Sequence, residues 1–429
     1  MSALPGDGSM DTVPPFRSRF APTFWVANTL ELFERLAFYG SKAILAVFLA
    51  ERVGLGDWGS TLAGLFSGVL YMLPILAGTL VDRYGFRRCL LACFAMFALG
   101  YLAIGLAGMR AGEGLLQALG RGPYVVGALL FTAVGGSLIK PCIVGTVAHT
   151  TAPSAKALGY SIYYTLVNLG GAVGPMLALL VREQLGIEYV LLVSSLTSAV
   201  LLLATALFFR EPAPVRHPDH PPPRTMLQVL RDLGRVLRNG RFLLFLLIFS
   251  GFWMMFWQIF LSLPFYVKDV LHVARFELLE TVDAWSIILL QVAVTAVTRR
   301  LRPILTMAAG FAVASASWLL IPLSSSPWVV VAALVVFAIG ETIQAPRYYE
   351  YVADLAPRGQ VGTYMGFAFL PVAIGAFIGG PLSSYLLSHY MRSPRPGTMW
   401  AAVSMIGFFS TVLLVSYDRL LHRDHPTWG

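Results

Sequence analysis

The sequence predicts an all-α membrane protein in which twelve transmembrane helices form two six-helix halves. Of its 429 residues, 57% are hydrophobic and 12% are charged, whereas a soluble domain is about 25% charged. The apolar residues form continuous runs of helix length rather than the alternating ten-residue strands of an outer-membrane barrel. One crossing takes about 20 apolar residues, so the chain has room for twelve helices joined by short loops.

Continuous apolar runs locate the helices along the chain. In the first half they cover residues 24–50, 61–81, 89–109, 123–150, 158–181 and 189–209. In the second half they cover residues 242–267, 281–298, 304–324, 328–354, 361–388 and 398–417. The first 22 residues lack the short apolar core and cleavage site of a signal peptide, so we expect the first helix itself to direct insertion into the membrane.

A proline-rich segment, 210–241, separates the two sets of helices. After its prolines comes a helix-like stretch, 225–237, in which leucine and valine are interleaved with arginine. This pattern is typical of an amphipathic helix whose basic face lies against lipid headgroups. The sequence therefore divides into an N-terminal half (1–209), a cytoplasmic linker with an amphipathic helix (210–241) and a C-terminal half (242–429).

The distribution of basic residues predicts the orientation of the chain. An even number of crossings places both termini on one side of the membrane, and the segments on that side carry more than twice the Lys and Arg of the loops on the other. Basic residues concentrate in cytoplasmic loops, so we expect an integral protein of the cell (inner) membrane with cytoplasmic termini. The net charge of +9 then follows from topology, and we expect a monomer in the lipid bilayer with no nucleic-acid partner.

Six charged residues lie deep within the expected helices, where each costs about 2.5–3.5 kcal/mol at the bilayer centre. They are Glu31, Glu34, Arg35 and Lys42 in the first helix, Lys140 in the fourth and Glu341 in the tenth. Polar and aromatic residues of the same and neighbouring helices accompany them: Tyr39, Tyr71, Tyr163, Tyr164, Asn168, Trp253 and Gln258. One interpretation is a set of ion pairs that hold helices together, although desolvation makes buried pairs poor stabilisers. We favour a water-filled cavity of both charges, which suits a zwitterionic substrate and proton-carrying carboxylates.

A second motif, GTLVDRYGFRR, follows the helix at 61–81 and contains Asp82, Arg83 and Gly85. Glycine permits a tight turn, aspartate can cap a neighbouring helix, and arginines add charge on the inner side. An ordinary basic turn is one interpretation. The motif also resembles the loop motif that the major facilitator superfamily carries after its second helix, which implies the fold of that superfamily.

The first helix resembles a narrower group within that superfamily. Its motif Glu31-x-x-Glu34-Arg35, followed by Phe38-Tyr39-Gly40, is similar to the signature of the proton-dependent oligopeptide transporter family. Further matches follow in order along the chain: Tyr71, Lys140, Tyr163, Tyr164, Asn168, Glu341 and Pro346.

The resemblance implies roles for these residues. In that family, the residues matching Glu31, Glu34 and Arg35 serve proton coupling. Those matching Lys42 and Lys140 bind the carboxylate of a peptide. Those matching Glu341 and Asn168 bind its amino group. With the neighbouring polar and aromatic residues, the expected substrate-binding set is Tyr39, Lys42, Tyr71, Lys140, Tyr164, Asn168, Trp253, Gln258 and Glu341.

The sequence departs from the family pattern in four places. Lys42 stands where the family usually has arginine, so a bidentate grip on a carboxylate is lost. Trp257 precedes Gln258 where the family often has an acid. The Asn-Pro of the eighth helix is not recognisable around residues 283–287. The linker is too short for the two extra helices that many bacterial members insert between their halves.

Four residues are candidates for gating. Arg347 and Glu350 lie at the cytoplasmic end of the helix at 328–354, on a face turned away from Glu341. They either pair with charges of the opposite half or form a local i,i+3 pair worth a few tenths of a kcal/mol. Asp82 and Arg83 of the loop motif complete the set.

The sequence therefore predicts a proton-coupled importer of short peptides or peptide-like zwitterions that works by alternating access. A proton-coupled carrier or exporter of another small molecule, such as an anion or a drug, remains open. So does a transport-inactive sensor or scaffold. No nucleotide-binding loop, metal cluster or nucleophilic triad is present, so we expect no enzyme activity and no cofactor.

Overall fold

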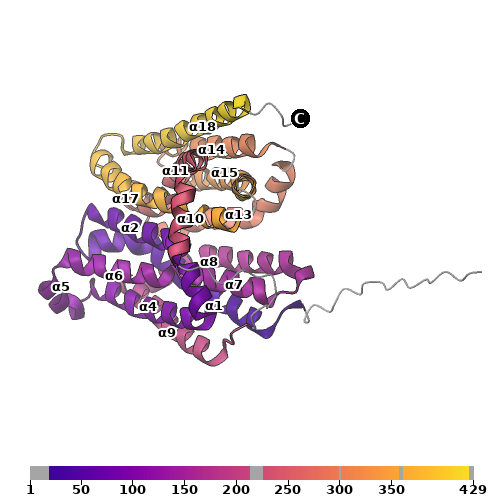
Figure 1. Cartoon of the computed structure of the whole chain (residues 1–429). Coiled ribbons are helices and arrows are strands. Elements are labelled where there is room, and N and C mark those ends of the chain that lie inside the picture. Colours follow the sequence, from indigo (N-terminus) through magenta and orange to yellow (C-terminus); the bar gives the residue numbers. More distant parts are fainter. Residues whose placement is uncertain (1–18, 213–225, 299–300, 357–360, 425–429) are drawn as a thin grey trace, which may run out of the picture.

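In the computed structural model, residues 19–212, 226–298, 301–356 and 361–424 are described, and their regular structure is entirely helical. Figure 1 shows two helical bundles side by side, one from the first half of the chain and one from the second, with α10 spanning them. The protein is thus an all-α membrane protein with two six-helix halves, as predicted.

The first bundle contains helices joined mostly by short loops. They are α1 (Pro22–Val47), the π-helix η2 (Phe48–Arg52), α2 (Trp58–Met72), α3 (Pro74–Tyr84), α4 (Phe86–Leu106), η3 (Arg110–Gly112), α5 (Glu113–Leu119), α6 (Arg121–Gly136), α7 (Ile139–Thr150), η4 (Pro153–Ala155), α8 (Lys156–Gln184) and α9 (Ile187–Phe208).

The linker helix and the second bundle follow. They comprise α10 (Met226–Arg238), α11 (Gly240–Leu261), α12 (Leu263–Asp269), α13 (Phe276–Thr298), α14 (Pro303–Trp318), η5 (Ile321–Leu323), α15 (Pro327–Asp354), α16 (Val361–Phe367), α17 (Leu370–Tyr390), η6 (Pro396–Thr398) and α18 (Met399–Asp424). The expected amphipathic helix is thus present as α10, whereas residues 1–18 and the proline-rich 213–225 lie outside the described residues. The exact boundaries of the two halves remain a prediction.

Ten segments of the described chain are long and apolar enough to cross a membrane, and the bent pair α2 and α3 makes an eleventh. We assign α1 as the twelfth. Its 26 residues exceed the length that a crossing needs, and it contains four charged residues, Glu31, Glu34, Arg35 and Lys42, that lower its mean hydropathy.

Four of the expected continuous helices are broken. Helix α2 ends at Met72 and α3 begins at Pro74, with a bend of 47° between them. Similar breaks precede or adjoin Pro141, Pro264 and Pro371. Proline cannot donate the helical hydrogen bond and disfavours helical geometry in the preceding residue, so each break falls just before a proline.

The halves are joined most tightly at the end that carries the loops after η2 and α12, which we call the closed end. There α2 packs on α17 and α8 packs on α13. A Cβ on Gly64 of α2 would lie 2.7 Å from the Gly380 Cα of α17, so only glycine allows this approach. Ion pairs join the halves at the same end: Lys268–Glu51, Arg275–Glu183 and Arg182–Glu277.

The opposite end, which we call the linker end, carries α10. This helix contacts α3 of the first half and α11 of the second, and its Val236 side chain is buried. The following Asn239 caps α11, because its Oδ1 accepts from the backbone N–H of Phe242 at 3.2 Å. Its Nδ2 donates to the Tyr364 hydroxyl at 2.9 Å, which ties the linker to the second half.

Candidate functional site

The first charged centre lies on α1. The Nε atom of Arg35 is 2.5 Å from Glu34 Oε2 and 3.4 Å from Glu31 Oε1, and all three side chains are at most 2% exposed. The helical period places Glu31 and Arg35 one turn apart. Gly170 of α8 packs directly against Arg35, so a larger residue there would push the two helices apart. The structure thus brings together the three residues expected to couple protons.

Lys140 belongs to the same centre. It follows the break between α6 and α7 and is half-buried, and its charge interacts with those of Glu31 and Glu34. Its Nζ lies 5.0 Å from the ring centroid of Tyr71 and 4.7 Å from that of Phe369 in the second half. These distances are within cation–π range, so Lys140 stands at the boundary between the halves.

Lys42 lies deeper towards the closed end, in a cage of aromatic rings. Its Nζ is 3.6 Å from the ring centroid of Phe260, 4.3 Å from Trp257, 5.4 Å from Phe256 and 5.5 Å from Tyr39. Three of these rings belong to α11 of the second half. Lys42 is 5% exposed, and among the described residues no carboxylate lies within ion-pair distance of its ammonium. Cation–π attraction therefore stabilises this charge across the interface.

The second half contributes a group of acids that faces Lys42. Glu280 and Asp283 of α13 are 3% and 7% exposed, and Glu341 of α15 is half-buried. The charge of Lys42 interacts with all three. Both carboxylate oxygens of Glu280, one of Asp283 and one of Glu341 are buried without a hydrogen-bond partner.

Glu280 and Asp283 were not among the expected site residues. The predicted helix began at residue 281, which placed Glu280 in a loop and Asp283 at the membrane surface. In the structure α13 begins at Phe276, so both residues lie inside the helix. The sequence could have indicated this group of acids. Glu277, Glu280 and Asp283 are spaced three residues apart, which places them on one helical face.

Gln258, which is expected to bind substrate, makes its hydrogen bonds within the second half. Its Nε2 donates to the carbonyl oxygens of Met254 and Gly379, at 3.1 and 3.2 Å, and its Oε1 accepts from Ser262 at 2.6 Å. The side chain is fully buried, so it ties α11 to α17 and has no polar atom left for a substrate. The neighbouring Trp257, which carried no expected role, faces Lys42 instead.

The remaining expected residues lie along the boundary between the halves. Tyr71 is buried against the Trp257 ring, and Trp253 is half-buried with an unpartnered Nε1. Tyr164 and Asn168 share a face of α8 with Gly171, whose added Cβ would touch Tyr39 of α1 and Ala284 of α13. Tyr164 is nevertheless 59% exposed. Of the expected residues along the boundary, Tyr164 is thus the most exposed.

The expected gating residues lie at the linker end. Arg347 Nη1 and Glu350 Oε2 are 2.5 Å apart, which is the local i,i+3 pair, and Arg347 Nη2 also reaches the Thr298 carbonyl at 3.5 Å. Asp82 and Arg83 are exposed at the end of α3. The next helix, α4, is capped by Glu211, whose carboxylate accepts from the backbone N–H groups of Phe86 and Arg87 at 2.7 and 2.8 Å.

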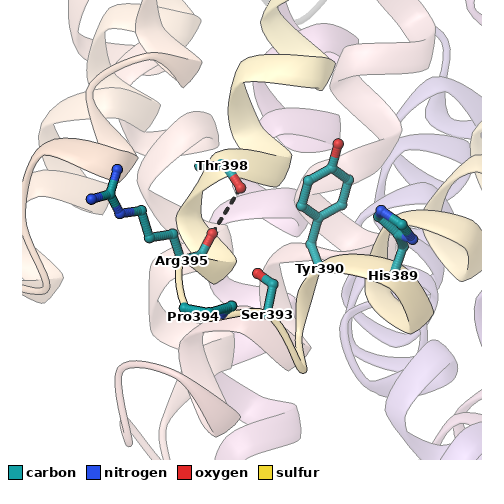
Figure 2. Close-up of a pocket in the computed structure, with 6 residues that line it drawn as sticks. All are labelled: His389, Tyr390, Ser393, Pro394, Arg395 and Thr398. Carbon is teal, nitrogen blue, oxygen red and sulfur yellow. Dashed lines mark hydrogen bonds between the residues drawn. The ribbon is translucent and has the colours of Figure 1, made fainter.

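Cavities also occur away from this boundary. One of about 370 Å³ lies at the loop between α17 and α18, and Figure 2 shows the residues around it. Its hydrogen bond, from the Thr398 hydroxyl to the Arg395 carbonyl at 2.7 Å, stays within the loop. Arg395 is the only Lys, Arg, Asp or Glu residue in its lining. The charged boundary between the halves is therefore the better candidate for a functional site.

Comparison with known proteins agrees with this architecture. The family model described as the Major Facilitator Superfamily matches residues 32–380 and 273–427. Among curated relatives, the multidrug resistance protein MdtH of Klebsiella pneumoniae (strain 342) is 26% identical over 386 residues, which cover 88% of this chain and 90% of the relative.

Solved structures with the same fold include members of the POT family. A POT family transporter in complex with 5-aminolevulinic acid has a TM-score of 0.74 and 17% identity, covering 92% of this chain and 96% of the other. The peptide transporter POT in complex with sulfate has a TM-score of 0.75 and 17% identity, covering 94% and 95%. With the family match, these likenesses confirm the predicted fold, and the chain belongs to the Major Facilitator Superfamily of membrane transporters.

Proposed function

We propose that this transporter couples an inward flow of protons to the import of short peptides or peptide-like zwitterions by alternating access. The observation that carries the proposal is the separation of charge between the halves. Lys140 and Arg35 lie in the first half, whereas Glu341 and Asp283 lie in the second. A zwitterion bound between the halves would meet a cation at its carboxylate and an anion at its amino group.

The α1 centre supports proton coupling. Two buried carboxylates share one guanidinium, and burial of like charges favours the neutral form of one of them. A proton arriving at Glu31 or Glu34 would weaken the hold of these carboxylates on Arg35 and Lys140. Those cations would then be free to bind the substrate carboxylate.

The orientation also belongs to this proposal. With both termini in the cytoplasm and the chain acting as a monomer in the cell membrane, the closed end faces outward and the linker end faces inward. The exposure of Tyr164 near the linker end supports an inward-facing conformation. Alternating access then requires the closed end to open.

The test is uptake of di-alanine into proteoliposomes with and without an inward proton gradient. We expect accumulation above the external concentration with the gradient and equilibration only without it. Accumulation that is the same with and without the proton gradient would contradict proton coupling. No movement of di-alanine in either condition, although the protein is folded and inserted, would contradict peptide transport.

A second candidate function is proton-driven export of organic cations. Two observations favour it: the named relatives include multidrug resistance proteins, and the second half presents acids beside an aromatic cage, a surrounding that also binds organic ammonium groups. Ethidium in the same proteoliposomes separates the candidates. Ethidium movement against its gradient, coupled to protons and without di-alanine uptake, would replace import of zwitterions by export of cations.

A further inference from the structure

We propose that Glu280 and Asp283 of α13 form a second proton-binding site, which carries one proton in each transport cycle and is controlled by Lys42 of the opposite half. The inference rests on the proposed proton-coupled transport. It adds a site in the second half to the α1 centre in the first. Two structural observations carry it: the ladder of acids on α13 and the unpartnered oxygens of its inner members.

The ladder begins at the closed end. Glu277, Glu280 and Asp283 follow at intervals of three residues on one side of α13. Glu277 is fully buried and paired with Arg182 of α8, whose Nη2 also donates to the Ala274 carbonyl at 2.7 Å. Glu280 lies one turn deeper and Asp283 one turn deeper again. The outermost acid is thus neutralised by an ion pair, whereas the two inner ones have none among the described residues.

The inner acids are buried without hydrogen bonds. Glu280 is 3% exposed and neither of its carboxylate oxygens has a partner, and one oxygen of Asp283 is in the same state at 7% exposure. An ionised carboxylate buried in this way would carry a large desolvation cost. Binding a proton removes the charge, so the neutral acid is the form that this conformation can hold.

The charged groups around the ladder come from four helices. Lys42 faces it from α1, and Glu341 faces Asp283 from α15. Arg182 of α8 is engaged with Glu277. Lys268 and Asp269 of α12 interact with each other and with Glu51 at the closed end. Among the described residues, Lys42 is therefore the cation without an ion pair whose charge acts on both inner acids.

Lys42 has two possible stabilising environments. In this conformation its ammonium lies in the cage formed by Tyr39, Phe256, Trp257 and Phe260, most of which moves with the second half. Before the halves rotate, while the linker end is still open, the ammonium can leave the cage and pair with Asp283 or Glu280, and the displaced proton leaves towards the linker end. A carboxylate then forms in place of the neutral acid, its O–H bond breaks, and the proton passes to water as hydronium.

Opening of the closed end reloads the site. Separating α8 from α13 breaks the Arg182–Glu277 pair, which lies one turn above Glu280, and admits water to the ladder. Hydronium protonates the inner carboxylates, and Lys42 returns to its cage on closing. Each cycle therefore moves one proton through this site in addition to the proton at the α1 centre.

The experiment measures proton stoichiometry. Proteoliposomes with the membrane potential clamped at zero are loaded to equilibrium with di-alanine over a series of pH gradients. The slope of log accumulation against the pH gradient gives the number of protons coupled to each substrate. We expect Glu280→Gln with Asp283→Asn to lower the slope by one, which is about a tenfold lower accumulation at a gradient of one pH unit.

Controls make the outcome decisive. Ser286 lies one turn further along α13 and its hydroxyl donates to the Val282 carbonyl at 2.7 Å, so Ser286→Ala should keep the wild-type slope. Exchange at equal pH shows whether each variant still moves substrate. A double variant with the wild-type slope would overturn the second site, whereas a wild type that does not accumulate di-alanine would overturn the proposed function instead.

A second measurement tests the proposal if the double variant fails to fold. Infrared difference spectra of the wild type and of Asp283→Asn alone, recorded during a pH jump, report the carbonyl stretch of protonated carboxyl groups. We expect one band of the wild type to be lost or reduced in the variant. Identical spectra from both proteins would overturn the assignment.

Discussion

At the scale of single residues, the position of Arg35 explains how one cation can serve two acids. Its Nε lies between Glu34, the adjacent residue, and Glu31, one helical turn away. Neither carboxylate has another ion-pair partner among the described residues. A change in the charge of one acid therefore alters the pull on Arg35 directly.

Glu34→Gln tests this arrangement. Glutamine keeps the size of the side chain but cannot take up a proton, so we expect exchange of di-alanine at equal pH to continue and uphill uptake to lose the contribution of the α1 proton. Accumulation at a gradient of one pH unit should then fall about tenfold, because the second site of α13 still carries its proton. Glu113→Gln on the exposed α5 is the matched control and should accumulate substrate normally. Unchanged uphill uptake by Glu34→Gln would remove this residue from coupling.

Glu341→Gln tests the acidic pole of the substrate site. Loss of a charge-assisted hydrogen bond of about 1.5–3 kcal/mol should weaken binding of peptides with a free amino terminus by roughly tenfold to a hundredfold. N-acetylated peptides lack that charge and should lose much less affinity. Equal affinities for both classes, in the variant and the wild type, would reduce Glu341 to a structural role.

At the scale of secondary structure, proline does not decide alone where a helix ends. Breaks adjoin Pro74, Pro141, Pro264 and Pro371, whereas Pro175, Pro346 and Pro381 lie inside continuous helices. A proline within a membrane helix is tolerated where neighbouring helices and local adjustments satisfy the freed carbonyl groups. Packing against other helices therefore separates the broken spans from the continuous ones.

The close approach of α2 and α17 gives a prediction for the closed end. A side chain at Gly64 would meet the Ala376 carbonyl oxygen, 2.7 Å from an added Cβ. Gly64→Val should therefore force the helices apart at a cost of about 1–3 kcal/mol and shift the protein towards the outward-open state. Spin labels on α2 and α17 should report a longer separation.

The control for this prediction is Gly127→Ala in α6, because no atom lies within 4 Å of an added Cβ there. It should leave the label separation unchanged. If Gly64→Val leaves it unchanged as well, the contact between α2 and α17 does not set the closure.

The pair at the linker end of α15 tests gating. Reversing both charges, as Arg347→Glu with Glu350→Arg, preserves a local pair but reverses the sign that each position presents to the first half. We expect slower di-alanine transport if the pair gates the inner side. The analogous swap of Asp232 and Arg235 on α10, an exposed i,i+3 pair, is the control and should transport normally. Normal transport by the α15 double variant would show that Arg347 and Glu350 form only a local pair and do not gate the inner side.

At the scale of the whole molecule, ion pairs of different burial hold the closed end together. Glu277 is fully buried in its pair with Arg182, whereas Arg275 and Glu183 are 61% and 36% exposed. Desolvation makes a buried charge that loses its partner far more costly than an exposed one. The Arg182–Glu277 pair should therefore dominate the closure.

Arg182→Ala should accordingly open the closed end. It leaves the Glu277 carboxylate buried without an ion-pair partner, at about 3–5 kcal/mol, whereas Arg275→Ala breaks a pair worth at most about 1 kcal/mol. Distances between labels at Leu185 and Leu323, which are 60% and 76% exposed, should gain a longer component only in Arg182→Ala. Equal distance distributions in both variants would contradict the dominance of the buried pair.

The sequence by itself determined the helical membrane fold and the α1 centre. Crossing a bilayer requires long apolar helices, so composition and run length were enough to place the spans. The helical period then set Glu31, Glu34 and Arg35 close together, because their contacts lie within one helix. Lys140 and Glu341 were recognisable as ionisable residues in apolar surroundings.

Only the tertiary structure decided what those side chains meet across the halves. The rings around Lys42, the acids of α13 and the bonds of Gln258 to α17 come from helices far apart in sequence. Helical periodicity fixes which residues of one helix share a face, but the rotation of each helix against its neighbours depends on the packing of every contact surface. That packing places Lys42 opposite Glu280 and Asp283 and turns Gln258 away from the boundary.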